Sequence, residues 1–212
     1  PNGLDHARFQ PGKTVPVEPG LVLFVGRLEY YKGVDVLLDA WEQVAQTHPK
    51  ARLVLLGAGT AEAALRARLK KSGHRASVEF EGFVSEEEKV LWLQRAEVLV
   101  QPSHKEGWGL TVLEANACGT PVVATRVPGL QDSVRHEETG LLVERSSPSA
   151  LAESVTRILD DSALRDRLSA GAIEWANRFS WDAVADAFAT VLTAVARRER
   201  LPPVRDFLSS EE

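Results

Sequence analysis

The chain has 212 residues, of which 44% are hydrophobic and 26% charged, and its net charge is -5. These values are typical of a soluble globular protein with room for one ordinary domain and some additions. The negative charge argues against a surface built mainly for nucleic acid or anionic lipid. A single cysteine excludes an internal disulfide framework and suits a reducing compartment.

The sequence contains no methionine and opens on Pro1-Asn2-Gly3. We therefore expect it to be a piece of a longer protein, and N-terminal processing is the alternative. Residues 1–19 carry prolines and turn residues without sustained periodicity, so we interpret them as a linker.

Short apolar runs alternate with stretches of helical periodicity along the rest of the chain. In chain order they predict a strand at 21–26, a helix within 32–49, a strand at 51–57, a helix at 60–73, a strand at 77–82, a helix at 85–96, a strand at 97–103, a helix at 110–119, strands at 121–127 and 139–145, and helices near 148–160, 162–178 and 181–198.

Repeated strand–helix units with apolar strands predict an α/β fold, a doubly wound Rossmann-like parallel sheet of about six strands with helices on both faces. We place this domain at 20–180, a separate C-terminal helix at 181–200 and a tail at 201–212. Ligands bind such sheets beyond the carboxyl ends of the strands, so the loops at those ends are the candidate site.

Two cations follow the first predicted strand. Arg27 and Lys32 flank a short loop that leads into a helix with Gly33 in its first turn. Cations beside a helix N-terminus suit an anion, above all a diphosphate. Solvated surface residues are the alternative, and these residues alone do not decide between the two.

The stretch HKEGWGLTVLEA (104–115) follows the fourth predicted strand. Gly107 and Gly109 remove side chains where the chain turns into a helix, so backbone N–H groups can approach a negatively charged ligand. Glu114, about one turn into that helix, is suited to accept hydrogen bonds from hydroxyls such as those of a ribose. Glu106, ahead of the helix, would face another part of the same ligand. On spacing alone, a capping carboxylate and a surface glutamate remain the alternative.

Other catalytic signals are weak or missing from the sequence. There is no Asp-x-Asp, no metal-ligand spacing of His or Cys, no Walker-type loop and no nucleophile elbow. His104 is a candidate proton donor, although a lone loop histidine is more often solvated. The GAG at 57–59 follows the wrong strand for a dinucleotide fingerprint, and we interpret Cys118 as core packing.

Taken together, these residues resemble the retaining glycosyltransferases of family 4, which have the GT-B fold. The resemblance rests on segments that occur in that family's order: VGRLEYYKGVDVLLDA, LLGAGT, EGFVS and PSHKEGWGLTVLEANACGTPVVATRVPGLQDSVRHEETGLLV. PNGLDHARFQP resembles the segment that joins the family's two domains. Glu106 and Glu114 form its E-x7-E element, and Trp108 stands where the family usually has Phe.

The resemblance implies a role for each matching position. Arg27 and Lys32 would bind the diphosphate of a sugar nucleotide, and Glu114 would hold the ribose hydroxyls. Glu106, the candidate catalytic residue, would contact the donor sugar, and Val84 would line the base pocket. Sugar hydroxyls and phosphates would meet the backbone amides of Gly107, Trp108, Gly109, Leu110 and Thr111.

The resemblance also implies partners and cofactors. The family works without a bound metal and uses a nucleoside-diphosphate sugar, here expected to be of UDP or GDP type. Its N-terminal domain, which carries the acceptor site, is missing from this sequence, and the helix at 181–200 resembles the one that crosses back to it.

We therefore expect the donor-binding C-terminal half of a cytoplasmic glycosyltransferase that transfers nothing when alone. We expect no nucleic-acid partner, and membrane association only through the missing domain. A stand-alone sugar-nucleotide-binding or regulatory module is the alternative. Epimerases that share the fold are a third possibility, but they usually differ around the acidic pair.

Overall fold

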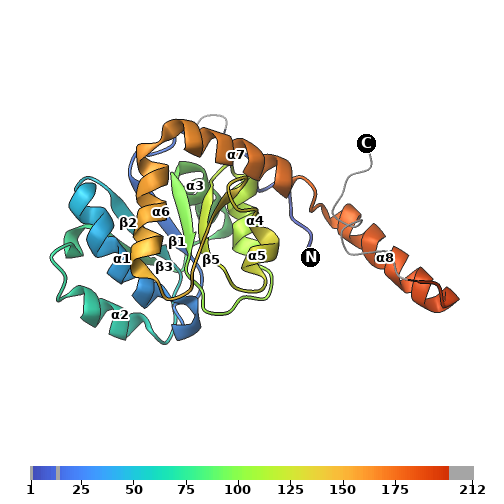
Figure 1. The fold of residues 1–212 in the computed structure, drawn as a ribbon, viewed down its shortest axis with the longest axis horizontal. Helices are drawn as coiled ribbons and strands as arrows, with labels where there is room; N and C mark the ends of the chain where they lie inside the picture. Colours follow the sequence, from blue (N-terminus) through green and yellow to red (C-terminus); the bar gives the residue numbers. More distant parts are fainter. Residues whose placement is uncertain (1, 13–14, 201–212) are drawn as a thin grey trace.

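A computed structural model describes residues 2–12 and 15–200; the predicted tail at 201–212 lies outside the described residues. The centre of the domain is a six-stranded sheet of order β3-β2-β1-β4-β5-β6. Every pairing between neighbouring strands is parallel. Helices cover both faces of this sheet (Figure 1), which confirms the predicted doubly wound α/β fold.

The elements follow the predicted order. The strands are β1 (Leu21–Val25), β2 (Arg52–Leu56), β3 (Val78–Gly82), β4 (Val98–Gln101), β5 (Val122–Thr125) and β6 (Gly140–Val143). The helices are α1 (Val34–Thr47), α2 (Glu62–Leu69), α3 (Glu86–Arg95), α4 (Leu110–Ala117), α5 (Leu130–Ser133), α6 (Pro148–Asp160), α7 (Ser162–Ala176) and α8 (Trp181–Arg197), with 3-10 turns η1 (Tyr30–Lys32) and η2 (Arg75–Ser77).

Two details differ from the sequence prediction. Helix α2 stops at Leu69, four residues before the predicted end at residue 73. The predictions also lacked α5 and both 3-10 turns, because segments of three or four residues are too short to show a helical period.

The sheet is buried on both faces. Helices α1, α2 and α6 pack on one face around a core that includes Phe24 and Trp41. On the other face, α3 and α4 pack around a core that includes Leu23 and Phe179. Helix α7 crosses between the layers, with Leu168 in the first core and Trp175 in the second. All five residues of β1 are buried, which explains its unbroken apolar run.

The strand order reverses between β1 and β4. From β1 the chain builds outward through β2 and β3 and then returns to the other side of β1 to form β4. The helices that follow β1 and β4, α1 and α4, therefore pack on opposite faces of the sheet. Such a point is where doubly wound domains bind their ligands.

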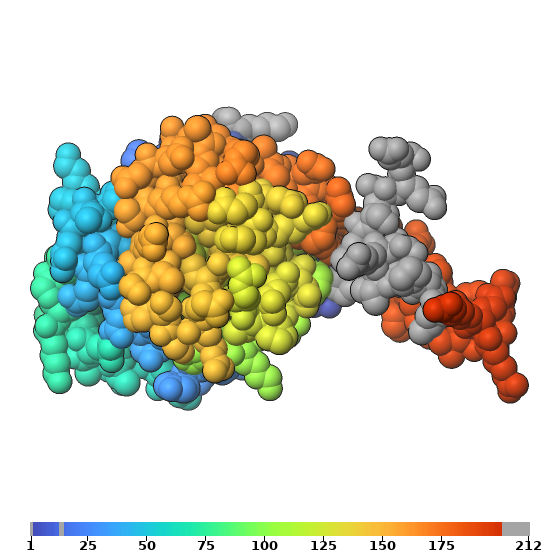
Figure 2. All heavy atoms as spheres, in the orientation of Figure 1, coloured from blue at the N-terminus to red at the C-terminus, as the bar shows by residue number. Residues whose placement is uncertain are grey.

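Helix α8 projects away from the domain (Figures 1 and 2), beyond the C-terminal end of α7. Its large apolar side chains are exposed at Trp181, Phe188, Leu192 and Val195. This helix thus presents an exposed apolar face. Within the described part of the chain, no helix combines the length and the apolar character needed to cross a membrane.

The Cys118 thiol provides a test of this packing. Burial, with a smaller effect of the Glu114 carboxylate, raises the pKa of Cys118 to about 12. At pH 8 only about one molecule in ten thousand would then carry a thiolate. We expect a chromogenic disulfide reagent to label the folded protein very slowly and the urea-unfolded protein fully. Rapid stoichiometric labelling of the folded protein would show that this part of the core is open.

Candidate functional site

The loops after β1 and β4 are in backbone contact at the carboxyl edge of the sheet. Gly33, between η1 and α1, has a φ of 66°, and a Cβ there would lie 2.1 Å from the carbonyl oxygen of Pro102. A side chain at this position would clash with backbone, so a glycine is required. The amide of His104 also donates a hydrogen bond of 2.7 Å to the carbonyl of Tyr31. These contacts fix the two loops against each other.

This contact brings two predicted site residues together. Lys32 Nζ lies 2.5 Å from Glu106 Oε2, and the two side chains are only 13% and 19% exposed. The hydroxyl of Ser103 donates to the same carboxylate oxygen at 3.4 Å. Lys32, predicted to bind the diphosphate, and Glu106, predicted to contact the sugar, therefore form an ion pair at the point where the strand order reverses.

Tyr31 organises the cations of the β1 loop. The Arg27 guanidinium donates a hydrogen bond of 2.6 Å to the Tyr31 hydroxyl and lies 5.8 Å from the centre of its ring. Lys32 Nζ is 5.5 Å from the same ring centre. Tyr31 was not predicted from the sequence, where its only signal was its position between the two predicted cations.

A second ion pair holds Glu114. Lys89 Nζ from α3 lies 3.0 Å from Glu114 Oε1 and 3.0 Å from Glu86 Oε1. Burial raises the pKa of Glu114, and the neighbouring Lys89 charge opposes that rise. Lys89 was not predicted from the sequence either. Its signal was the Ser85 capping box, which starts α3 at the carboxyl end of β3 and so places Lys89 at the ligand-binding edge.

A cavity of about 250 Å³ lies between these parts, at the carboxyl ends of β1, β2 and β3. Arg27, Val84 and Lys89 contribute to its lining. The structure thus places Val84, predicted to face a base, near the predicted diphosphate-binding Arg27 and near the lysine that holds Glu114. The exposed Phe83 side chain also borders this cavity.

The glycine-rich turn before α4 packs against the residue that precedes α5 and against the core. Gly129, just before α5, has a φ of 84°, and a Cβ there would lie 2.6 Å from the carbonyl oxygen of Glu106. The Trp108 ring packs edge-to-face on Phe179, with 5.7 Å between ring centroids. The Trp108 side chain therefore belongs to the core, which leaves its backbone amide as the group that could serve a ligand.

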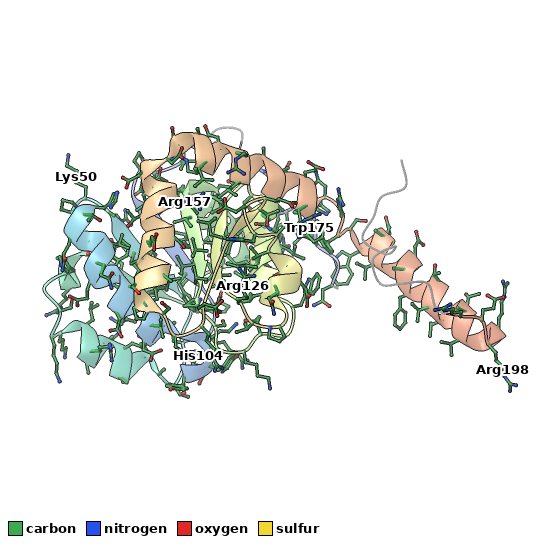
Figure 3. All side chains as sticks on the ribbon, in the orientation of Figure 1. Lys50, His104, Arg126, Arg157, Trp175 and Arg198 are labelled. Atoms are coloured by element: carbon green, nitrogen blue, oxygen red, sulfur yellow. The ribbon has the colours of Figure 1, made fainter. Side chains whose placement is uncertain are left out.

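All predicted site residues thus lie at one edge of the sheet, in two neighbouring groups. Lys32 and Glu106 form the first group with the turn that continues through Gly107, Gly109, Leu110 and Thr111 into α4. Arg27, Val84 and the Lys89–Glu114 pair form the second. His104, labelled at this edge in Figure 3, packs against the ring of Tyr30 at 5.7 Å. Across residues 2–12 and 15–200, no group of three or more His, Cys, Asp and Glu side chains is arranged to hold a metal ion.

Glu114 and Glu88 should change stability with pH in opposite directions. Burial raises the pKa of Glu114 above 4.5, so the folded protein binds this proton more tightly than the unfolded protein does. The stability that the bound proton contributes is lost as the pH rises through the folded pKa. The pKa of Glu88 is lowered by hydrogen bonds from Ser85, so its contribution is present above 4.5 and lost as the pH falls.

We therefore compare Glu114→Gln and Glu88→Gln by urea unfolding between about pH 4 and pH 7. Relative to the parent, Glu114→Gln should become more stable toward neutral pH, and Glu88→Gln should become less stable. Equal pH slopes for the two variants would contradict the burial of Glu114.

Comparisons with known proteins match most of this chain to one family. A model of the family described as glycosyl transferases group 1 matches residues 6–175. The D-inositol 3-phosphate glycosyltransferase of Acidothermus cellulolyticus is 39% identical over 199 residues, which cover 86% of this chain and 44% of that protein. The chain spans about half the length of the curated relatives it matches.

Two solved structures are similar to this one. The C-terminal domain of a glycosyl transferase group 1 family protein, LpcC, from Francisella tularensis has a TM-score of 0.74 and 25% identity, covering 81% of this chain and 95% of that one. Anabaena HepE, solved in complex with UDP and glucose, has a TM-score of 0.81, covering 91% of this chain and 55% of that one. At 22% identity, the likeness to HepE shows the fold alone.

Proposed function

The chain belongs to the glycosyl transferases group 1 family, and we propose that it is the donor-binding half of a retaining glycosyltransferase. The enzyme would move a sugar from a nucleoside-diphosphate sugar to an acceptor without a bound metal. The observation that carries this proposal is the placement of two lysine-paired glutamates, Glu106 and Glu114, beside the reversal point of the sheet.

The diphosphate would lie between Arg27, Lys32 and the backbone amides that lead into α4. A negative ligand is favoured there by both cations and by the N-terminal end of the helix. Because Lys32 already pairs with Glu106, a diphosphate would share that lysine, and the Glu106 carboxylate would then be available to accept hydrogen bonds from the sugar.

The same groups would serve the reaction. The bond between the anomeric carbon and the diphosphate oxygen breaks, and its electron pair leaves with the diphosphate. The acceptor oxygen bonds to the same face of that carbon, and its hydroxyl proton passes to the departing diphosphate oxygen. Negative charge grows on the departing diphosphate, where Arg27 and Lys32 are already in place to stabilise it. Glu106 would hold the sugar beside the bond that breaks.

The nucleoside would occupy the cavity of about 250 Å³. Its ribose hydroxyls would donate to Glu114 while its base lies along Val84. A buried carboxylate accepts hydrogen bonds and donates none, so ribose hydroxyls match its chemistry.

The acceptor would bind to the other half of the full-length enzyme. The exposed apolar residues of α8, Phe188, Leu192 and Val195, would pack against that half. The chain alone would therefore bind nucleotide but transfer no sugar.

Lys32→Met should weaken the binding of UDP or GDP at least about tenfold, because a charge-assisted contact to phosphate contributes roughly 1.5–3 kcal/mol. Isothermal titration calorimetry measures this change. The matched control is Lys50→Met. Lys50 is exposed and precedes β2, so it lies at the opposite edge of the sheet (Figure 3). If the two variants bind equally well, Lys32 does not hold the diphosphate.

Glu106→Gln should weaken the binding of the nucleoside-diphosphate sugar but not that of the nucleoside diphosphate. Since Glu106 would contact only the sugar, the variant should lose about tenfold in affinity for the nucleoside-diphosphate sugar. It should keep parental or slightly higher affinity for the nucleoside diphosphate itself, because Lys32 loses a competing partner. The same calorimetric titrations, run with both ligands, measure the difference. Equal losses of affinity for the two ligands would show that Glu106 does not contact the sugar.

A further inference from the structure

Lys89 is held in a fixed position beside the proposed nucleoside cavity. Its ammonium lies 3.0 Å from Glu86 and 3.0 Å from Glu114, and its side chain is 14% exposed. The same ammonium lies 5.0 Å from the ring centre of the buried Phe9. A flexible lysine side chain has many rotamers in water, and these contacts restrict it to one place.

The Lys89 contact uses one side of the Glu114 carboxylate. Lys89 donates to Oε1 at 3.0 Å, while none of the described residues hydrogen-bonds to Oε2. A carboxylate oxygen without a protein partner is available to a ligand, and Lys89, which holds Glu114, lines the proposed nucleoside cavity. Because Oε1 is fixed, the direction in which Oε2 points is fixed as well.

The ion pair also preserves the charge that this role needs. Glu114 has a side chain that is only 8% exposed, and an isolated carboxylate is costly to bury. A protonated Glu114 would have fewer acceptor sites for hydroxyls and would act as a donor instead. Lys89 opposes this protonation and so favours a carboxylate that accepts from both ribose hydroxyls.

We propose that Lys89 is a positioning residue that holds Glu114 as an oriented carboxylate and thereby makes the site prefer ribonucleotides over deoxyribonucleotides. This inference rests on the proposed function. The sequence gives Lys89 no such role, because it follows Glu86, Glu87 and Glu88 in a charged stretch that is typical of a solvent-exposed helix face.

The test measures how strongly the site prefers a ribonucleotide over its deoxy forms, rather than affinity alone. The parent is first titrated with UDP, GDP and ADP, and the nucleotide that binds is then compared with its 2′-deoxy and 3′-deoxy forms. We expect the parent to bind the ribonucleotide about tenfold more tightly than at least one deoxy form. Lys89→Met should reduce this ratio to about twofold or less. Lys89→Arg, which keeps the charge, and Lys50→Met should leave it near the parental value.

A double mutant shows whether Lys89 acts through Glu114. In a Glu114→Gln background, the further change Lys89→Met should leave the ribose ratio unchanged, because the oriented carboxylate is already lost. If Lys89→Met does not fold with an unpaired Glu114, Lys89→Gln replaces it; this amide can still donate a hydrogen bond but carries no charge, and the ratio should fall in the same way.

The outcomes separate the two proposals. A parent that binds a ribonucleotide without discrimination, or a Lys89→Met protein that keeps the parental ratio, overturns the role of Lys89 and leaves the proposed function standing. A parent that binds none of the three nucleoside diphosphates overturns the proposed function, and this inference with it.

Discussion

The candidate site depends on the absence of one side chain. The loops after β1 and β4 approach so closely at Gly33 that a Cβ there would lie 2.1 Å from the carbonyl oxygen of Pro102. Because nothing separates the two loops, Lys32 on one and Glu106 on the other come within 2.5 Å. The strand order brings the loops to the same edge of the sheet, and this glycine allows them to touch.

Both candidate glutamates follow the same electrostatic rule. A site for a negatively charged ligand must not repel it, yet hydroxyl recognition calls for carboxylates. Each glutamate is therefore paired with a lysine from a different segment, Glu106 with Lys32 and Glu114 with Lys89. The pairs lower the local negative charge while the carboxylates stay within reach of a ligand. Without Lys89, burial would favour a protonated Glu114.

The sequence predicted the fold and the edge of the sheet better than the contacts within the site. Unbroken apolar strands and helical periods indicated the sheet, and the loop positions placed Arg27, Lys32 and Glu106 at its carboxyl edge. The Lys32–Glu106 pair joins residues 74 positions apart, so it depends on a strand order that periodicity does not reveal. Lys89 was missed because its charged neighbours indicate a solvated surface rather than a binding pocket.

Helix α8 has a different kind of stability from the rest of the chain. Its 17 residues begin at a Ser180 cap, but apolar side chains such as Phe188 and Leu192 remain exposed. Most of the stability of a helix in a protein comes from the packing of its apolar face, and this face of α8 is exposed. Figure 1 places it well away from the loops after β1 and β4. Fraying or proteolysis of α8 would therefore be a local event, separate from the cooperative unit that forms the sheet and its binding edge.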